Sequence, residues 1–343
     1  MNNIPAVLHF STGFPVLIGL HHVQDYASVK GADESSRLIV RKPNGEIINA
    51  FGIVHGNHHY IIATRPRCMI DESNFQWIPS QKCAVGYLEF ETKYKEYKKV
   101  PFRLCLDGRS PYPFLGTELF RSVEQIEDAK VERSCFGYPN RIVFTTQDGI
   151  FGFYLEPDLL HFIEIDDSNH PGILDFKIQY IGISTGAKGN RDFADRLWNH
   201  EKIREISGLI QRDSPNLQVY IFGYKAGYVI EAFPNHFIVD SKIIESTIGM
   251  FAWAQVLEAA LIRKFQPEHN KDLKNFLISE YPHWLPDLKN ILVPNWEGGR
   301  PSKLSTTIAS DCRHNSSGSW VFGRFYTDTV PAQDLFSFEL DLN

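Results

Sequence analysis

Short runs of apolar and β-branched residues alternate with turn residues over the first 145 positions. The predicted strands are 7–10, 14–20, 37–40, 47–54, 59–63, 85–90 and 141–144, with one helical period over 117–129. Pro43-Asn44-Gly45 between two of these runs is typical of a hairpin turn. Regular short strands favour a β-sandwich or small barrel, so we expect residues 1–145 to form a β-rich domain for recognition or regulation.

The pattern changes from residue 146 onward. Apolar strands are predicted at 149–155, around Tyr180 and at 216–224, and helical spacing of apolar residues predicts helices over 190–206 and 246–265, the second ended by Pro267. This order predicts a small α/β unit over 146–280, with 281–343 as a C-terminal extension that packs on one of the two domains. The expected fold class is therefore α+β.

Composition and charge narrow the function classes. The hydrophobic fraction of 43% and charged fraction of 22% are ordinary for a globular protein, and the formal net charge is −6. A nucleic-acid site on such a chain must be local, or a metal ion must help to meet the phosphates. The five cysteines contain no CxxC pair, and neither a signal peptide nor a membrane-spanning run is evident, so we expect a cytoplasmic protein without a membrane partner.

Two local motifs have alternative interpretations. His55-Gly56-Asn57-His58-His59 is either a metal site or, as we favour, a polar hairpin tip. The stretch 87–103 interleaves lysines with Tyr94 and Tyr97, which suits a phosphate backbone and stacked bases. Interspersed glutamates dilute that charge, so a solvated strand is the favoured interpretation.

A longer pattern connects polar residues across 146–275. Its members are Gly152-Phe153-Tyr154, Tyr180-Ile181-Gly182, Arg196 and His200 one helical turn apart, Glu258 in the long helix, and Asn270 after it. This order resembles the GIY-YIG nuclease family, with spacing similar to that of its restriction-enzyme members. Gly149-Ile150-Phe151 is a second candidate for the first motif, with phenylalanine at the tyrosine position.

The resemblance implies a three-stranded sheet flanked by helices and a role for each motif residue. Tyr154 would act as general base or orient the attacking water, and Tyr180 would hold the nucleophile or the phosphate. Arg196 would donate to phosphoryl oxygens, which suits its planar fork. His200 would assist proton transfer.

The remaining positions concern the metal and the substrate. Glu258 would hold one Mg²⁺ or Mn²⁺, and Asn270 would orient Glu258 or the fold around it. By sequence alone Glu258 is equally well an exposed residue on the wet face of its helix. Lys188 and Arg191 would meet the substrate backbone, or they form an ordinary loop surface.

Two hypotheses of function follow. The first is a metal-dependent endonuclease, with DNA favoured over RNA and restriction or antiviral defence as its context. The second is a catalytically inactive module that binds nucleic acid or protein with the same fold. A homo-oligomer and a regulatory ligand or protein on the N-terminal domain are compatible with both.

Overall fold

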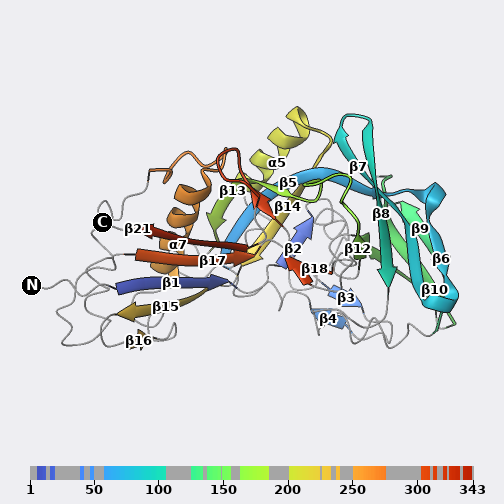
Figure 1. Cartoon of the computed structure of the whole chain (residues 1–343), viewed down its shortest axis with the longest axis horizontal. Coiled ribbons are helices and arrows are strands. Elements are labelled where there is room, and N and C mark those ends of the chain that lie inside the picture. Colours follow the sequence, from blue (N-terminus) through green and yellow to red (C-terminus); the bar gives the residue numbers. More distant parts are fainter. Residues whose placement is uncertain are drawn as a thin grey trace, which may run out of the picture.

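The computed structural model of the chain is a strand-rich, mixed α+β protein. It describes residues 6–12, 16–19, 39–41, 47–49, 58–105, 125–133, 137–147, 149–155, 163–184, 201–224, 226–232, 237–239, 250–275, 303–309, 312–314, 320–322, 324–332 and 335–341. Figure 1 shows the central strand β5 running across the middle of the molecule, between the region of α7 and the hairpin formed by β7 and β8.

A nine-stranded sheet forms the centre of the molecule. Its main path is β12 (Ile163–Ile165), β8 (Glu96–Cys105), β7 (Cys83–Lys93), β5 (His59–Ile70), β13 (Phe176–Ile183) and β20 (Phe325–Tyr326). Off this path, β14 (Leu217–Tyr224) pairs with β2 (Val16–Gly19) and β5, and β6 (Gln76–Ile78) pairs with β7.

Strand β5 belongs to both halves of this sheet. Its first residues pair antiparallel with β13 on one side and β14 on the other, whereas residues 67–70 pair with β7. Almost every β5 side chain is buried, because the strand lies inside the sheet along most of its length. A single covalent strand therefore couples the Tyr180 region to the β7–β8 hairpin.

A second sheet packs beside the hairpin. It contains β9 (Ile126–Arg133), β10 (Pro139–Thr146) and β11 (Gly149–Tyr154), with β10 in the middle. Phe90, Phe102, Ile142 and Phe144 are fully or almost fully buried in one hydrophobic core that the two sheets share. Trp77 packs edge-on against Phe144, with ring centroids 6.0 Å apart.

Two α-helices are described, and each packs on a strand of the central sheet. Helix α5 (Glu201–Asp213) lies on β14 and buries one apolar stripe through Ile203, Ile206 and Ile210. Helix α7 (Met250–Phe265) packs on β13. It ends where the sequence predicts, and Gln266 follows in a left-handed conformation (φ 50°) before Pro267.

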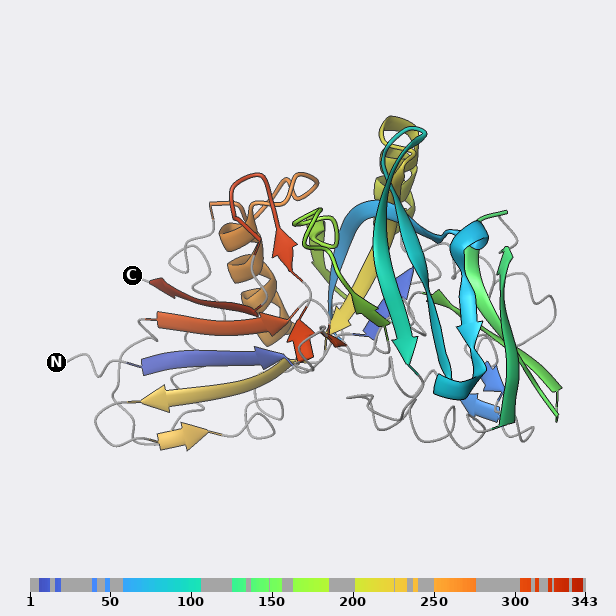
Figure 2. The same ribbon diagram turned by 45° about the vertical axis from the view of Figure 1, so that its right-hand side comes forward.

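The remaining described elements are short or lie in a third sheet. That five-stranded sheet has the order β16 (Phe237–Val239), β15 (Ala226–Ala232), β1 (Ala6–Thr12), β17 (Lys303–Ala309) and β21 (Leu335–Asp341). The short elements are the pairs β3 (Ile39–Arg41) with β4 (Ile47–Asn49) and β18 (Cys312–His314) with β19 (Trp320–Phe322), and the 3-10 turns η2 (Glu72–Asn74) and η3 (Pro79–Gln81). Figures 1 and 2 both show α7 beside the five-stranded sheet.

Strands from both sides of the boundaries predicted near residues 145 and 280 pair with one another. Strand β5 lies between β13 and β14, and β1 lies between β15 and β17. Residues 126–129, the end of the helix predicted over 117–129, lie in strand β9 because their backbone pairs with β10, whereas residues 117–124 lie outside the described residues. Strand pairing is decided by partners far away in sequence, which a local pattern does not encode. Among the helices that the structure describes, none is long and apolar enough to cross a membrane.

Candidate functional site

The structure describes four of the eight predicted site residues in whole or in part. Tyr180 lies in β13, Glu258 in α7 and Asn270 in the turn after α7, while the backbone of Tyr154 ends β11. Lys188, Arg191, Arg196 and His200 lie outside the described residues.

The two tyrosine strands lie in different sheets. The strand of Tyr154 pairs with β10 in the three-stranded sheet, where Tyr154 lies opposite Arg141. The strand of Tyr180 pairs instead with β5, which places Tyr60 directly opposite Gly182. The motif at 152–154 is therefore not the neighbour of the motif at 180–182, and Gly149-Ile150-Phe151 lies in the same separate strand.

Tyr60 is the tyrosine that lies beside Tyr180. The two rings are 6.0 Å apart between centroids and tilted by 34°. Tyr60 is buried, whereas Tyr180 is half-buried. The sequence signal was weak, because Tyr60 lies in the run His58-His59-Tyr60-Ile61-Ile62, which has no Gly-x-Tyr motif.

Gly182 permits this contact between the rings. A Cβ at position 182 would lie 2.6 Å from both Cζ and Oη of Tyr60 and 2.7 Å from Cε1 of Tyr180. Any larger residue must displace one or both rings. The glycine of the Tyr-Ile-Gly motif thus has a packing reason, independent of any catalytic role.

Asn270 binds the backbone of the same strand. Its Oδ1 accepts from the Ile181 N–H and its Nδ2 donates to the Ile181 carbonyl, both at 2.9 Å. One turn residue earlier, the His269 N–H donates to the Gln179 carbonyl at 3.1 Å. Strand β20 pairs with β13 only at Phe176 and Lys177. Beyond those residues the turn at 269–270 replaces β20 as the hydrogen-bonding partner along that edge of β13.

Glu258 lies half-buried on a helix whose other positions are mostly buried. Ala254, Leu261 and Ile262, one turn away on either side, are buried. The helix is tied to the start of β5, because His59 Nε2 lies 3.1 Å from the Ala254 carbonyl. Burial lowers the pKa of His59 to about 4, so the imidazole is neutral near pH 7.

The tyrosine pair and α7 both lie near the end of the sheet where β5 begins. The Ser184 N–H donates to the His58 carbonyl and the His58 N–H donates to the Tyr224 carbonyl, so β13 and β14 end where β5 begins. Side chains alternate along a strand, so Tyr60 and Tyr180 project from the face opposite to that of His59. The tyrosine pair and α7, which contacts His59, therefore lie on opposite faces at this end of the sheet.

Proteins often supply only one or two carboxylate ligands to Mg²⁺, and water and substrate phosphate oxygens supply the rest. The single carboxylate of Glu258 is compatible with such a site. Over the described residues, no group of three or more His, Cys, Asp or Glu side chains is placed to hold a metal ion. Within the histidine motif, residues 55–57 lie outside the described residues, and Nε2 of His59 donates to a carbonyl, so that nitrogen is not available as a ligand.

Comparison of the chain with protein-family models, with curated proteins and with solved structures gives no match.

Proposed function

We propose that the chain is a divalent-metal-dependent endonuclease that hydrolyses phosphodiester bonds, with DNA favoured over RNA. The observation that carries the proposal is the tyrosine pair on β5 and β13, at the sheet end from which residues 185–200 continue. Those residues include Lys188, Arg191, Arg196 and His200, the cationic and imidazole groups that the GIY-YIG resemblance implies.

The proposal changes one assignment made from the sequence. Tyr60 takes the place of Tyr154, because Tyr60 is the residue whose ring lies against Tyr180 and Gly182. Tyr180, the more exposed of the two, contacts the phosphate or the attacking water, and Tyr60 supports its position. Asn270 acts on the backbone of β13 and positions Tyr180 without touching the substrate.

Charge stabilisation comes from groups on both sides of the scissile phosphate. Arg196 donates to phosphoryl oxygens and His200 moves a proton to or from the water. Glu258 would hold Mg²⁺ or Mn²⁺, and the bound ion would supply positive charge to stabilise the leaving group. The spacing that remains after this change, from Arg196 to His200 and from Glu258 to Asn270, is similar to that of restriction enzymes and supports a role in restriction or antiviral defence.

The burial of Tyr60, which is only 1% exposed, favours a second candidate function. A hydroxyl closed off from solvent suits a packing residue, and the fold would then serve as a non-catalytic module that binds nucleic acid or protein. The two candidates differ in whether metal ions and Glu258 matter to any activity.

The test is cleavage of plasmid DNA and of a structured RNA by purified protein with Mg²⁺, with Mn²⁺ and with EDTA. We expect metal-dependent cutting that is lost in Glu258→Gln and in Tyr180→Phe. Tyr60→Phe is expected to reduce cutting, whereas the matched variant Tyr154→Phe leaves it unchanged. Equal cutting by wild type and Glu258→Gln would refute the proposed site, and wild-type protein that cuts neither polymer would favour the binding module.

A further inference from the structure

The hairpin formed by β7 and β8 carries the three most exposed tyrosines of the described residues. Tyr94 at its tip is 69% exposed, and Tyr97 and Tyr87 are 44% and 41% exposed on its strands. By contrast, Tyr220 and Tyr224 are buried in the central sheet. Exposed tyrosines grouped on one projecting element indicate a contact surface.

The tip also carries more positive than negative charge. Lys93 and Lys98 both lie near one carboxylate, that of Glu96, at 3.5 and 4.0 Å. Lys95 points its Nζ over the ring of Tyr94, 5.1 Å from the centroid. Lysines at the tip therefore outnumber its acids, although the chain as a whole carries a net charge of −6.

The acid at the base of the tip is already engaged. Glu91 is buried and forms an ion pair with Arg67 at 2.9 Å, and its other carboxylate oxygen accepts from the Lys95 N–H at 3.0 Å. That second bond holds Lys95 in a left-handed conformation, with φ of 60°. The backbone of the tip is therefore fixed by a buried group.

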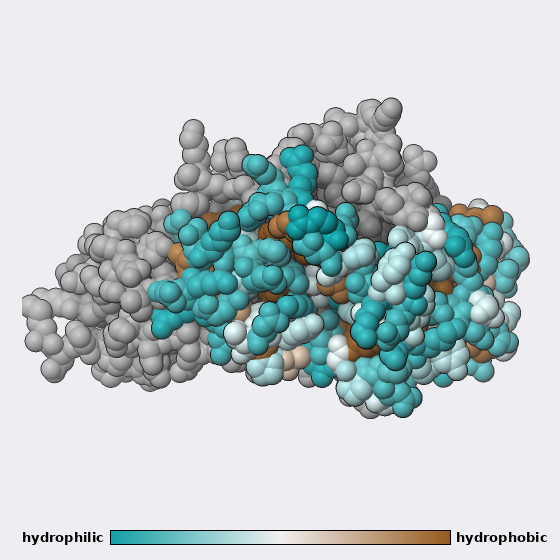
Figure 3. All heavy atoms as spheres, turned by 90° about the horizontal axis from the view of Figure 1, so that it is seen from above, coloured by the Kyte–Doolittle hydropathy of each residue, from teal (hydrophilic) through white to brown (hydrophobic). Residues whose placement is uncertain are grey.

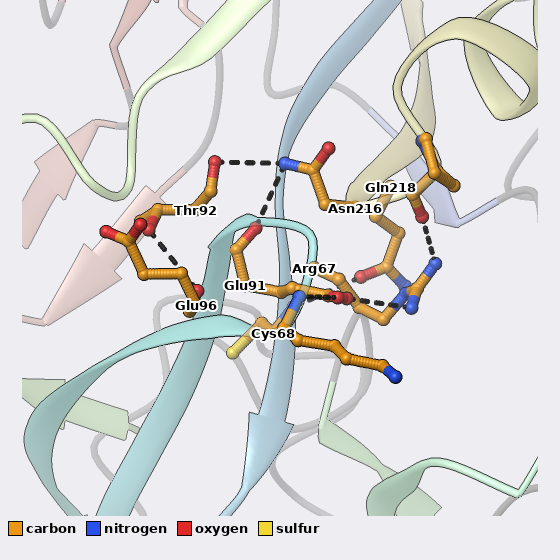
Figure 4. Close-up of polar contacts among 9 residues, drawn as sticks. Arg67, Cys68, Glu91, Thr92, Glu96, Asn216 and Gln218 are labelled. Atoms are coloured by element: carbon orange, nitrogen blue, oxygen red, sulfur yellow. Dashed lines mark hydrogen bonds and ion pairs between the residues drawn. The ribbon is translucent and has the colours of Figure 1, made fainter.

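The hairpin is also fixed to the sheet that carries Tyr180. Asn216, which directly precedes β14, donates from Nδ2 to the carbonyls of Glu91 and Thr92 at 3.2 and 3.0 Å (Figure 4). In Figures 1 and 2 the hairpin and α5 rise on the same side of the molecule. The tip is thus a preformed projection that keeps its position relative to the candidate site.

The chemistry of this surface selects its ligand. Seen from the side on which the tip projects, the described surface is mostly hydrophilic with scattered apolar spots (Figure 3), which does not match a hydrophobic protein partner. Tyrosine rings stack on unpaired bases and lysines meet phosphates. We propose that the β7–β8 tip, through Tyr94, Tyr97 and the lysines beside them, binds single-stranded nucleic acid.

The inference deepens the endonuclease function and rests on it for its choice of ligand. It predicts that the enzyme prefers substrates that carry unpaired bases. It also decides between the two interpretations of residues 87–103, in favour of a binding surface.

The test is fluorescence anisotropy with a labelled oligothymidylate and a duplex, both in EDTA so that no cleavage is required. Wild-type protein is expected to bind the single strand more tightly than the duplex. Tyr94→Ala is expected to weaken that binding about tenfold, whereas Tyr94→Trp retains it because a ring remains.

Charge is tested with a matched pair of lysines. Lys93→Ala is expected to lower the slope of log affinity against log salt by about 0.7. The control is Lys130→Ala on β9, which is 59% exposed and pairs with Glu132, and which is expected to change neither slope nor affinity.

Each result bears on the inference separately from the nuclease activity. Tip variants that bind like wild type, or wild-type protein that binds no single strand, would overturn the inference even if DNA is cut. If the tip variants lose binding while no metal-dependent cutting is found, the inference stands and the endonuclease proposal fails.

Discussion

Replacing Asn270 with alanine is the sharpest test of how the candidate site is held. The side chain of Asn270 is 6% exposed and forms two hydrogen bonds of 2.9 Å with the backbone of Ile181. Ile181 itself is buried, so water does not readily replace the lost amide. The strand segment between Tyr180 and Gly182 loses the partner on its outer edge.

The magnitude follows from those two bonds. Each hydrogen bond contributes about 1 kcal/mol net, and each buried backbone group left without its partner adds a further desolvation cost of about 1–3 kcal/mol. Some relaxation of the edge reduces that cost, so we expect local destabilisation of about 3 kcal/mol. At about 1.4 kcal/mol per factor of ten, this corresponds to roughly a hundredfold change in local opening.

Amide hydrogen exchange measured by mass spectrometry reads this effect locally. Peptides covering 176–183 are expected to exchange up to roughly a hundredfold faster in Asn270→Ala than in wild type. Asn270→Asp keeps an acceptor for the Ile181 N–H, but it places a carboxylate against the Ile181 carbonyl. If the retained bond outweighs this repulsion, amide exchange at neutral pH speeds up less than in Asn270→Ala.

The matched control is Asn216→Ala, which likewise removes two side-chain bonds to the backbone, in this case both donated to carbonyls. It is expected to speed exchange over residues 91–97 and to leave 176–183 unchanged. Unchanged exchange over 176–183 in Asn270→Ala would refute the positioning role of Asn270, whatever happens to global stability.

Two further predictions concern the same end of the sheet. Gly182→Ala is expected to lower the free energy of unfolding by about 1–3 kcal/mol, because the alanine Cβ would collide with the rings of Tyr60 and Tyr180. The control is Gly208→Ala, where a Cβ meets nothing within 4 Å. Chemical denaturation is expected to show that this variant is as stable as wild type or more stable. His59, whose pKa burial lowers to about 4, is neutral in the fold while the unfolded chain binds a proton below about pH 6.5. The free energy of unfolding is therefore expected to fall by about 3 kcal/mol as pH decreases from about 6.5 to about 4. Chemical denaturation of His59→Gln over the same pH range is the check. If that variant loses as much stability as wild type, protonation of His59 is not the cause.

The sequence pattern predicted the secondary structure where neighbouring residues determine it. The strand at 217–224 and the end of the helix at Phe265 match the predicted elements, since alternation, helical spacing and a following proline act over a few residues. The Tyr-Ile-Gly strand and Asn270 were both selected from the sequence, and the structure shows them in direct contact. Their catalytic roles stay predictions.

Tertiary structure alone decided which tyrosine lies beside Tyr180. Tyr154 had the better motif and the nearer position in the chain, yet its strand pairs with β10, and Tyr60 reaches Gly182 across an antiparallel pairing of residues far apart in sequence. A motif records residue types along the chain, whereas pairing depends on which backbone edges remain open after other strands have paired. The pattern of apolar positions predicted a strand-rich chain and the family resemblance predicted phosphate chemistry, whereas the register between β5 and β13 determined which side chains meet there.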